Sequence, residues 1–229
     1  MSAFFIKRKK VAGMVAGILC VSFTLSAFVY AKTLENALTV GTERNFYFLV
    51  SDHGSMEVSA QMIGLQGGAG YSLTYQDGEY AAYSVYFSKN ESRDAQSSVA
   101  KIGESAEIVT VTSSPLYLKT PKQKKQAALI TGAFESLYGC MQVLNGEIAR
   151  LARGATQESS KRILQTLSRQ FAFLGKEYAE TVSGYKETCE NAEKRLLEAT
   201  SGVVYAKDLR YILCELSVAY ANLSKNFSL

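Results

Sequence analysis

A run of 21 residues without a charged side chain, residues 11–31, is the feature that most constrains this chain. A helix of about 20 apolar residues spans the hydrocarbon core of a bilayer. Four basic residues, 7–10, precede the run, and basic residues before a first span hold that end of a chain in the cytoplasm. We therefore expect residues 1–31 to direct the chain to the cell membrane, with its N-terminus cytoplasmic and the bulk of the chain extracytoplasmic.

Two interpretations of residues 1–31 are open at this point. A cleaved signal peptide has an apolar core of about 7–15 residues and a small-residue cleavage site. Val29, Tyr30 and Ala31 would serve as such a site. The apolar run is longer than that range, which favours a retained single-pass transmembrane anchor. Residues 32–43 are then expected to be a linker.

The exported part of the chain changes the sign of its charge. Residues 33–114 carry 4 Lys and Arg against 10 Asp and Glu, whereas residues 115–229 carry 16 against 11. This change predicts two domains, at residues 44–112 and 113–229. The acidic first domain argues against nucleic acid as a partner, because phosphate binding needs Lys and Arg.

The sequence lacks a recognisable constellation for catalysis or metal binding. His53 is the single histidine, and no CxxC pair is present, so the chain cannot supply the usual ligands of a zinc site. No acid–base pair or activated nucleophile is identifiable. We expect no catalytic residues, no metal and no cofactor, and a binding or scaffolding protein instead of an enzyme.

Residues 44–112 predict a small α+β domain with the element order β-α-β-β-α-β. Strands are expected at 46–50, 71–75, 80–87 and 107–111, with a hairpin turn at Asp77 and Gly78. The first helix is expected to bury the stripe Val58, Met62 and Leu65 and to end at Gly67. The second helix is expected to start near Ser88 or Asn90 and to bury Ala95, Val99 and Ile102. This split, ferredoxin-like order folds as an antiparallel sheet with both helices on one face, which leaves the other face open.

This domain resembles a SPOR domain, the sporulation-related repeat of bacterial envelope proteins. The likeness lies in the element order, the aromatic first strand, the glycine-ended first helix, and the aromatic residues around Val85 before a Ser/Asn/Asp-rich helix start. The resemblance implies binding of peptidoglycan glycan strands, especially those stripped of stem peptides, by an anchored protein of cell division or sporulation. Leu49 stands where the family often carries a Gln.

Strand alternation predicts which side chains face each way. The side chains expected to pack on the helices are Phe46, Phe48, Val50, Tyr83, Val85 and Phe87. The residues expected on the open face, as the glycan-binding site, are Tyr47, Leu49, Ser51, Ser84 and Tyr86. Aromatic rings flanked by small hydroxyls suit a sugar. The alternative is that these tyrosines cover the sheet or contact the second domain.

Residues 113–229 predict an all-α antiparallel domain. Thr120 is a candidate N-cap before Pro121, and Thr156 is a candidate cap of the next helix. We expect one helix ending at Gly154, a second with apolar spacing over about 40 residues, and a third from Leu209 to Leu223. They would form a bundle or a long hairpin capped by a short helix.

Two details of this domain are open to more than one interpretation. Cys189 and Cys214 lie about equally far from the turn at Gly202, so a disulfide between them is a hypothesis, with buried free thiols as the alternative. A basic cluster lies at the domain junction, at Lys119, Lys122, Lys124 and Lys125. It could contact anionic lipid or wall polymer, or be a solvated helix start.

Two functions are therefore weighed. The first is a membrane-anchored, extracytoplasmic protein that binds peptidoglycan glycan strands. The second is an envelope scaffold whose helical domain binds another protein, with a SPOR-like domain that no longer binds glycan. Binding to isolated cell-wall glycan would separate them.

Overall fold

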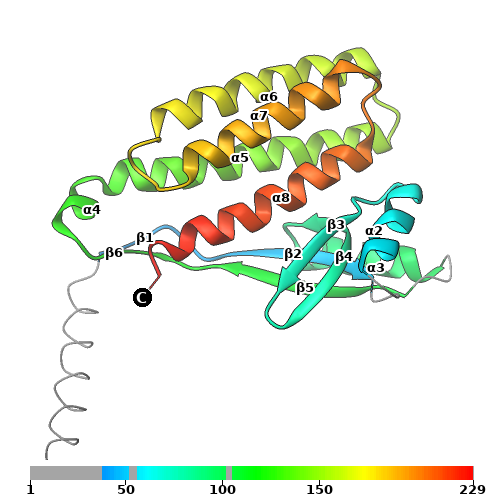
Figure 1. The fold of residues 1–229 in the computed structure, drawn as a ribbon, viewed down its shortest axis with the longest axis horizontal. Helices are drawn as coiled ribbons and strands as arrows, with labels where there is room; N and C mark the ends of the chain where they lie inside the picture. The colour runs from blue at the N-terminus through cyan, green and yellow to red at the C-terminus, as the bar shows by residue number, and fades with distance from the viewer. Residues whose placement is uncertain (1–37, 52–55, 102–104, 229) are drawn as a thin grey trace, which may run out of the picture.

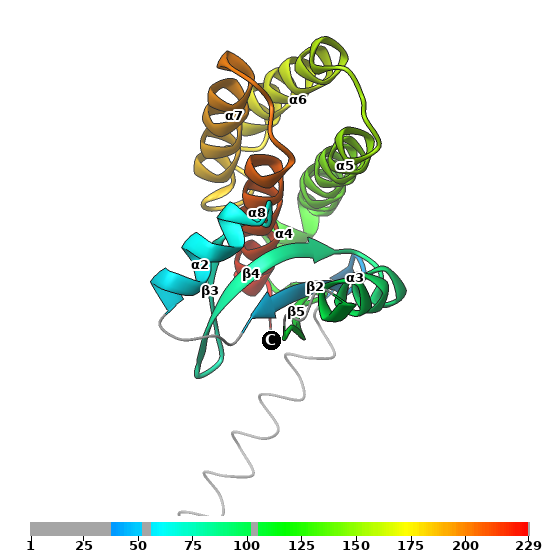
Figure 2. The ribbon, with the colours of Figure 1, turned by 90° about the vertical axis from the view of Figure 1, so that its right-hand side faces the viewer.

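The computed structural model describes residues 38–51, 56–101 and 105–228. A helical layer lies over a small β-sheet (Figure 1), and both layers are seen end-on in Figure 2. The predicted membrane segment, residues 32–37 of the predicted linker and Ile102 of the predicted second helix lie outside the described residues.

The sheet has the element order expected from the sequence. Its strands are β2 (Arg44–Ser51), β3 (Tyr71–Tyr75), β4 (Gly78–Tyr86) and β5 (Glu107–Ser113), and its helices are α2 (Met56–Leu65) and α3 (Lys89–Lys101). All strand pairs are antiparallel, in the spatial order β3-β4-β2-β5. The hairpin at Asp77 is confirmed, because Tyr75 pairs with Gly78 across it.

The buried stripe predicted for α2 is wrong at Met62 and Leu65, and the side chain of Val58 lies outside what the structure describes. Met62 is 54% exposed and Leu65 is 87% exposed, whereas Ile63 is 2% exposed. Ile63 packs in a cluster with Leu49, Ala81 and Tyr83 of the sheet. A short helix offers several apolar residues, and the position of the strands beneath it decides which of them is buried.

Five helices follow the sheet: α4 (Pro121–Lys125), α5 (Ala127–Ala152), α6 (Gln157–Glu177), α7 (Tyr185–Ser201) and α8 (Ala206–Lys225). Both predicted caps are confirmed. The Thr120 hydroxyl accepts a hydrogen bond from the backbone N–H of Gln123, completing a capping box, and the Thr156 hydroxyl accepts one from the N–H of Ser159.

The predicted helix of about 40 residues is two helices. The chain leaves the helix after Glu177 and re-enters it at Tyr185, and Gly184 between them has φ of 81°. A left-handed backbone at this position favours glycine and reverses the chain direction. As a result α5, α6, α7 and α8 form an antiparallel four-helix bundle, not the three helices expected.

Helix α5 resembles a membrane-spanning helix in its length and composition. It is the one helix in the described ranges that is long and apolar enough to cross a bilayer, by length and composition alone. Its residues Ile130, Leu137 and Leu144 are at most 1% exposed. We therefore interpret α5 as a core helix of the bundle.

A two-stranded ladder joins the start of the described chain to the bundle. Strand β1 (Leu38–Val40) pairs antiparallel with β6 (Leu116–Leu118). The backbone N–H of Tyr117 donates to the carbonyl oxygen of Phe227 at 2.9 Å, which ties the ladder to the end of α8. Part of the segment predicted as a linker is thus a strand.

The sheet and the bundle share one hydrophobic core. Phe46, Phe48 and Val50 are fully buried in one cluster with bundle side chains such as Leu213 and Tyr220. Helix α8 lies along the sheet between it and the other bundle helices (Figures 1 and 2). The prediction of an open sheet face is therefore wrong, and the segments 44–112 and 113–229 do not have separate cores.

The predicted faces of β2 are also reversed. Leu49 lies in the cluster covered by α2 and α3, where Ala60, Ala95 and Val99 pack. Phe46, Phe48 and Val50 face the bundle, as do Val85 and Phe87, whereas Tyr83 lies on the α2 and α3 side as expected. Alternation divides a strand into two faces, but only the larger apolar layer decides which face takes the bulkier side chains.

We predict that Phe46→Ala lowers the free energy of unfolding by about 3–5 kcal/mol and lowers the midpoint of the whole chain. The Phe46 ring lies 5.5 Å from the Tyr220 ring and 5.9 Å from the Phe87 ring. Far-UV circular dichroism in denaturant would measure the loss. Met62→Ala, at an exposed site, should change stability by less than about 0.5 kcal/mol. An unchanged midpoint of the helical signal in Phe46→Ala would contradict the shared core.

Candidate binding surfaces

The residues predicted to bind glycan do not form a surface. Leu49, Ser51 and Ser84 are 1%, 4% and 6% exposed. Tyr47 and Tyr86 are half-buried partners across β2 and β4, and burial is the main cause that raises the pKa of Tyr86. The structure places the set on the side of the sheet that α2 and α3 cover, so a glycan strand has no open face to lie on.

Arg44 at the start of β2 holds the other side of the sheet to the bundle. Its guanidinium donates to both carboxylate oxygens of Glu135, at 2.7 and 2.6 Å, and to the Tyr220 hydroxyl at 3.3 Å. The guanidinium also lies 3.7 Å from the Tyr138 ring centroid. Burial alone would lower the pKa of Arg44, but its hydrogen bonds to Tyr220 and Glu135 outweigh burial and raise it. These contacts hold the start of β2 against α5 and α8 at the edge of the shared core.

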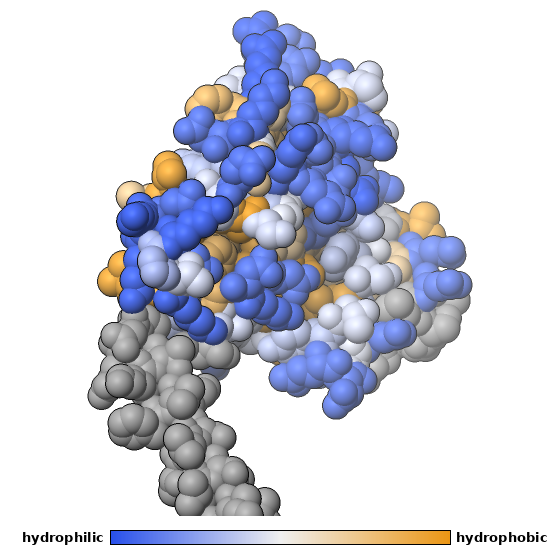
Figure 3. Space-filling model, turned by 60° about the vertical axis from the view of Figure 1, so that its left-hand side comes forward, coloured by the Kyte–Doolittle hydropathy of each residue, from blue (hydrophilic) through white to orange (hydrophobic). Residues whose placement is uncertain are grey.

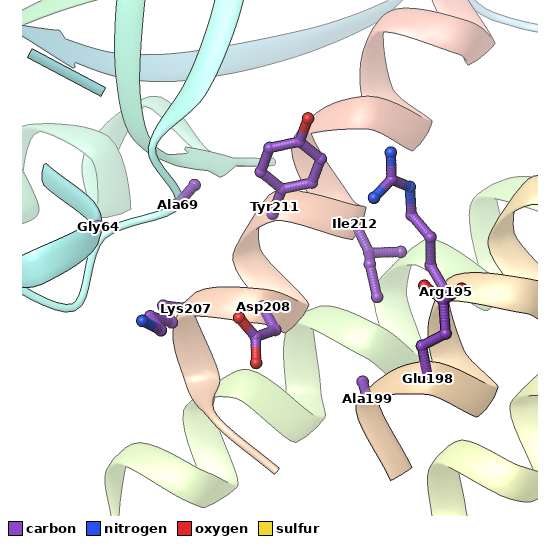
Figure 4. Close-up of a pocket in the computed structure, with 9 residues that line it drawn as sticks. All are labelled: Gly64, Ala69, Arg195, Glu198, Ala199, Lys207, Asp208, Tyr211 and Ile212. Carbon is purple, nitrogen blue, oxygen red and sulfur yellow. The ribbon is translucent and has the colours of Figure 1, made fainter. Parts of the chain in front are cut away.

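A cleft of about 440 Å³ lies where α2, α7 and α8 meet. Figure 4 shows its lining: Gly64 and Ala69 on one side, the start of α8 with Lys207, Asp208 and Tyr211, and Arg195, Glu198 and Ala199 of α7. The Tyr211 ring contacts Tyr71 at a centroid distance of 5.3 Å. Burial is the main cause that raises the pKa of Tyr71 to about 12.

The charges in this cleft are balanced. Arg195 pairs with Glu215 at 2.6 Å and lies 5.0 Å from the Tyr211 ring centroid. Lys207 stands beside Asp208 on the rim. A cleft lined by two basic and two acidic side chains favours no single class of charged ligand, so we assign it none.

A more open groove, of about 620 Å³, runs between α5 and α6. Ser136, Gly139, Cys140 and Val143 line it from α5, and Ile163, Thr166, Leu167 and Gln170 line it from α6, with Arg162 at its edge. Val143 is 49% exposed. Most of this lining is apolar, which suits a hydrophobic face and not a small polar ligand.

The apolar surface of the groove extends beyond the residues that line its centre. Helical spacing puts Leu129 on the α5 stripe of Gly139 and Val143, and Phe173 on the α6 stripe of Ile163 and Thr166. Leu129 is 47% exposed and Phe173 is 57% exposed. Because α5 and α6 are antiparallel, both residues lie toward the same end. From Leu129 to Val143 the stripe spans about 21 Å.

Basic side chains flank the groove on the α6 side. Arg162, Arg169 and Lys176 are exposed and recur every seven residues, so they form a row along one side of α6. Residues 127–177, which build α5 and α6, contain six Lys and Arg against four Glu, whereas residues 185–225 contain six basic and six acidic side chains. The positive charge of the bundle is therefore concentrated in the half that carries the groove.

The cysteines are structural. Cys140, Cys189 and Cys214 are free and buried, so the disulfide considered from the sequence is not formed. Burial raises the pKa of the Cys140 thiol to about 11, which leaves it protonated and unreactive near neutral pH. Within the residues that the structure describes, no group of His, Cys, Asp and Glu side chains could hold a metal ion.

Sequence reasoning missed the groove. A signal was present in α5, where Gly132 and Gly139 interrupt an apolar helix on one side, and in the seven-residue spacing of the α6 basic residues. Reading them together required knowing that α5 and α6 are neighbours. Comparisons of this chain with protein-family models, with curated proteins and with solved structures found no match. The likeness to SPOR domains stays a prediction from the sequence.

We predict that Arg44→Lys lowers the free energy of unfolding by about 1–2 kcal/mol. Lysine keeps the charge but has no second nitrogen to donate to Tyr220 while the first donates to Glu135, and it loses the planar contact with Tyr138. Arg162→Lys is the matched control, because the Arg162–Glu158 pair at 3.2 Å is exposed on both sides and contributes little. Chemical denaturation would measure both, and equal losses in the two variants would contradict this role of Arg44.

Proposed function

We propose that this chain is a membrane-tethered scaffold outside the cytoplasm, and that its α5–α6 groove binds an amphipathic helix of another envelope protein. The membrane tether comes from the apolar run at residues 11–31. The observation that carries the binding role is the apolar groove itself. We propose a binding role without catalysis.

The shape and charge of the groove define the partner segment. An amphipathic helix docks through apolar side chains at i, i+3, i+4 and i+7, and about 21 Å of stripe accommodates about 14 helical residues. Arg162, Arg169 and Lys176 along one side favour acidic residues on one flank of that helix. The α5 side of the groove, at Ser136, Gly139 and Val143, carries no charge.

Peptidoglycan binding stays a hypothesis from the resemblance alone. Burial of Leu49, Ser51 and Ser84 and the cover that α8 gives the sheet give it no support. We therefore favour a scaffold that binds another protein over a protein that binds peptidoglycan strands. Co-sedimentation with cell-wall sacculi, before and after removal of stem peptides, should show no binding that rises on removal.

The test uses a helical peptide of about 14 residues, with leucine at the docking positions and glutamate on the flanks. We expect it to bind the full chain held in lipid nanodiscs, and Gly139→Leu to weaken binding at least about tenfold by filling the groove. A Cβ atom at Gly139 would meet no atom within 4 Å, so the fold should tolerate the change. Fluorescence anisotropy of the labelled peptide would measure affinity.

Gly146→Leu is the matched control. Gly146 lies on the same helix beyond Val143, where the stripe ends, has open space around its Cβ position, and is absent from the lining of the groove. Both variants should be at least as stable as the native chain, because leucine favours a helix over glycine by roughly 0.8 kcal/mol. Equal affinity of the native chain and Gly139→Leu, or equal binding of a peptide with lysine in place of glutamate, would contradict the proposal.

A further inference from the structure

One end of the molecule gathers basic side chains beside the point where the described chain begins. Leu38, the first described residue, pairs with Leu118, and Lys119 follows directly. We call the set Lys119, Lys122, Lys124, Lys125 and Lys225 the basic foot. This end lies at the left of Figure 1, and the surface around it in Figure 3 is mostly hydrophilic.

The packing of this end holds the lysines together. The Lys119 ammonium donates to the carbonyl oxygen of Ser228 at 2.6 Å, and the Tyr117 N–H donates to Phe227. These contacts place the residues that follow α8, and with them Lys225 at its last position, against the segment that leads into α4. Lys122 and Lys125 are exposed and form no salt bridge within the described part of the chain.

Few negative charges oppose the basic foot. Asn226 contacts Ser183 in the turn between α6 and α7, so this turn belongs to the same end. The described segments that build this end, residues 38–43, 114–126, 176–184 and 224–228, carry six lysines against three carboxylate side chains, Glu43, Glu177 and Glu180. The lysines therefore present a net positive surface. Surface lysines of this kind are attracted to anionic lipid head groups and lose that attraction in high salt.

Chain length keeps this end near the membrane. Six residues, 32–37, separate the apolar run from Leu38, and at full extension they reach about 20 Å. We propose that the basic foot docks on the anionic lipid surface beside the tether, which holds the scaffold in one orientation. This inference rests on the membrane tether of the proposed function and adds a second, electrostatic contact to it.

The test places the tagged full chain in nanodiscs of phosphatidylcholine alone or of an equal mixture with phosphatidylglycerol. Lysine acetylation is followed by mass spectrometry. We expect Lys122 and Lys125 to react at least about threefold more slowly in the anionic discs, and the difference to vanish in about 1 M NaCl, where the Debye length is about 3 Å. Lys194 and Lys207, near the opposite end of the bundle, should react equally in both discs.

A variant separates docking from tethering. Lys122→Glu with Lys125→Glu should still enter the discs but lose the protection of Lys119 and Lys225, whereas Lys194→Glu with Lys207→Glu should keep it. Equal acetylation rates in the two discs would overturn the docking proposal and leave the tether intact. A chain that enters neither disc would overturn both.

Discussion

The contact between β2 and the helical bundle is the interaction on which the rest of the structure depends. Phe46, Phe48 and Val50 form no exposed sheet face, because Tyr220 and the leucines of α8 cover them. The Phe134 and Tyr220 rings meet at a centroid distance of 5.2 Å, which extends the same cluster into α5. Arg44 closes its edge through Glu135. By itself, the small sheet would expose these apolar side chains. Packed against the bundle, it shares one hydrophobic core with the helices.

This arrangement decides which surfaces remain for binding. One face of the sheet is covered by α8 and the other by α2 and α3, so the sheet positions the bundle and presents little of itself. The bundle uses α8 against the sheet, which leaves the α5–α6 side free to form a groove. The same packing brings the end of α8 to the β1–β6 ladder, where the lysines of the foot gather at the start of the described chain.

Local patterns predicted the elements well, and long-range packing decided the rest. The hairpin at Asp77, the caps at Thr120 and Thr156 and the β-α-β-β-α-β order follow from turn and cap chemistry that acts within a few residues. The face on which Leu49 lies and the exposure of Leu65 could not be predicted in this way. Alternation and helical spacing do not tell which layer packs on which side of an element. The break at Gly184 was obscured by apolar spacing that continues on both sides of it. The predicted glycan site was wrong for the same reason, because its residues lie on the face that α2 and α3 cover and α8 covers the other face.

Native-state hydrogen exchange tests the shared core most directly. The central amides of β2, at Phe48 and Val50, and those of α8, at Leu213 and Leu216, would be followed in the full chain as denaturant is raised. A shared core predicts that both sets exchange only through global unfolding, with the same free energy and the same dependence on denaturant. Exchange of β2 at a clearly lower free energy than α8 would contradict it, because the sheet would then separate from the bundle and expose the face that this structure buries.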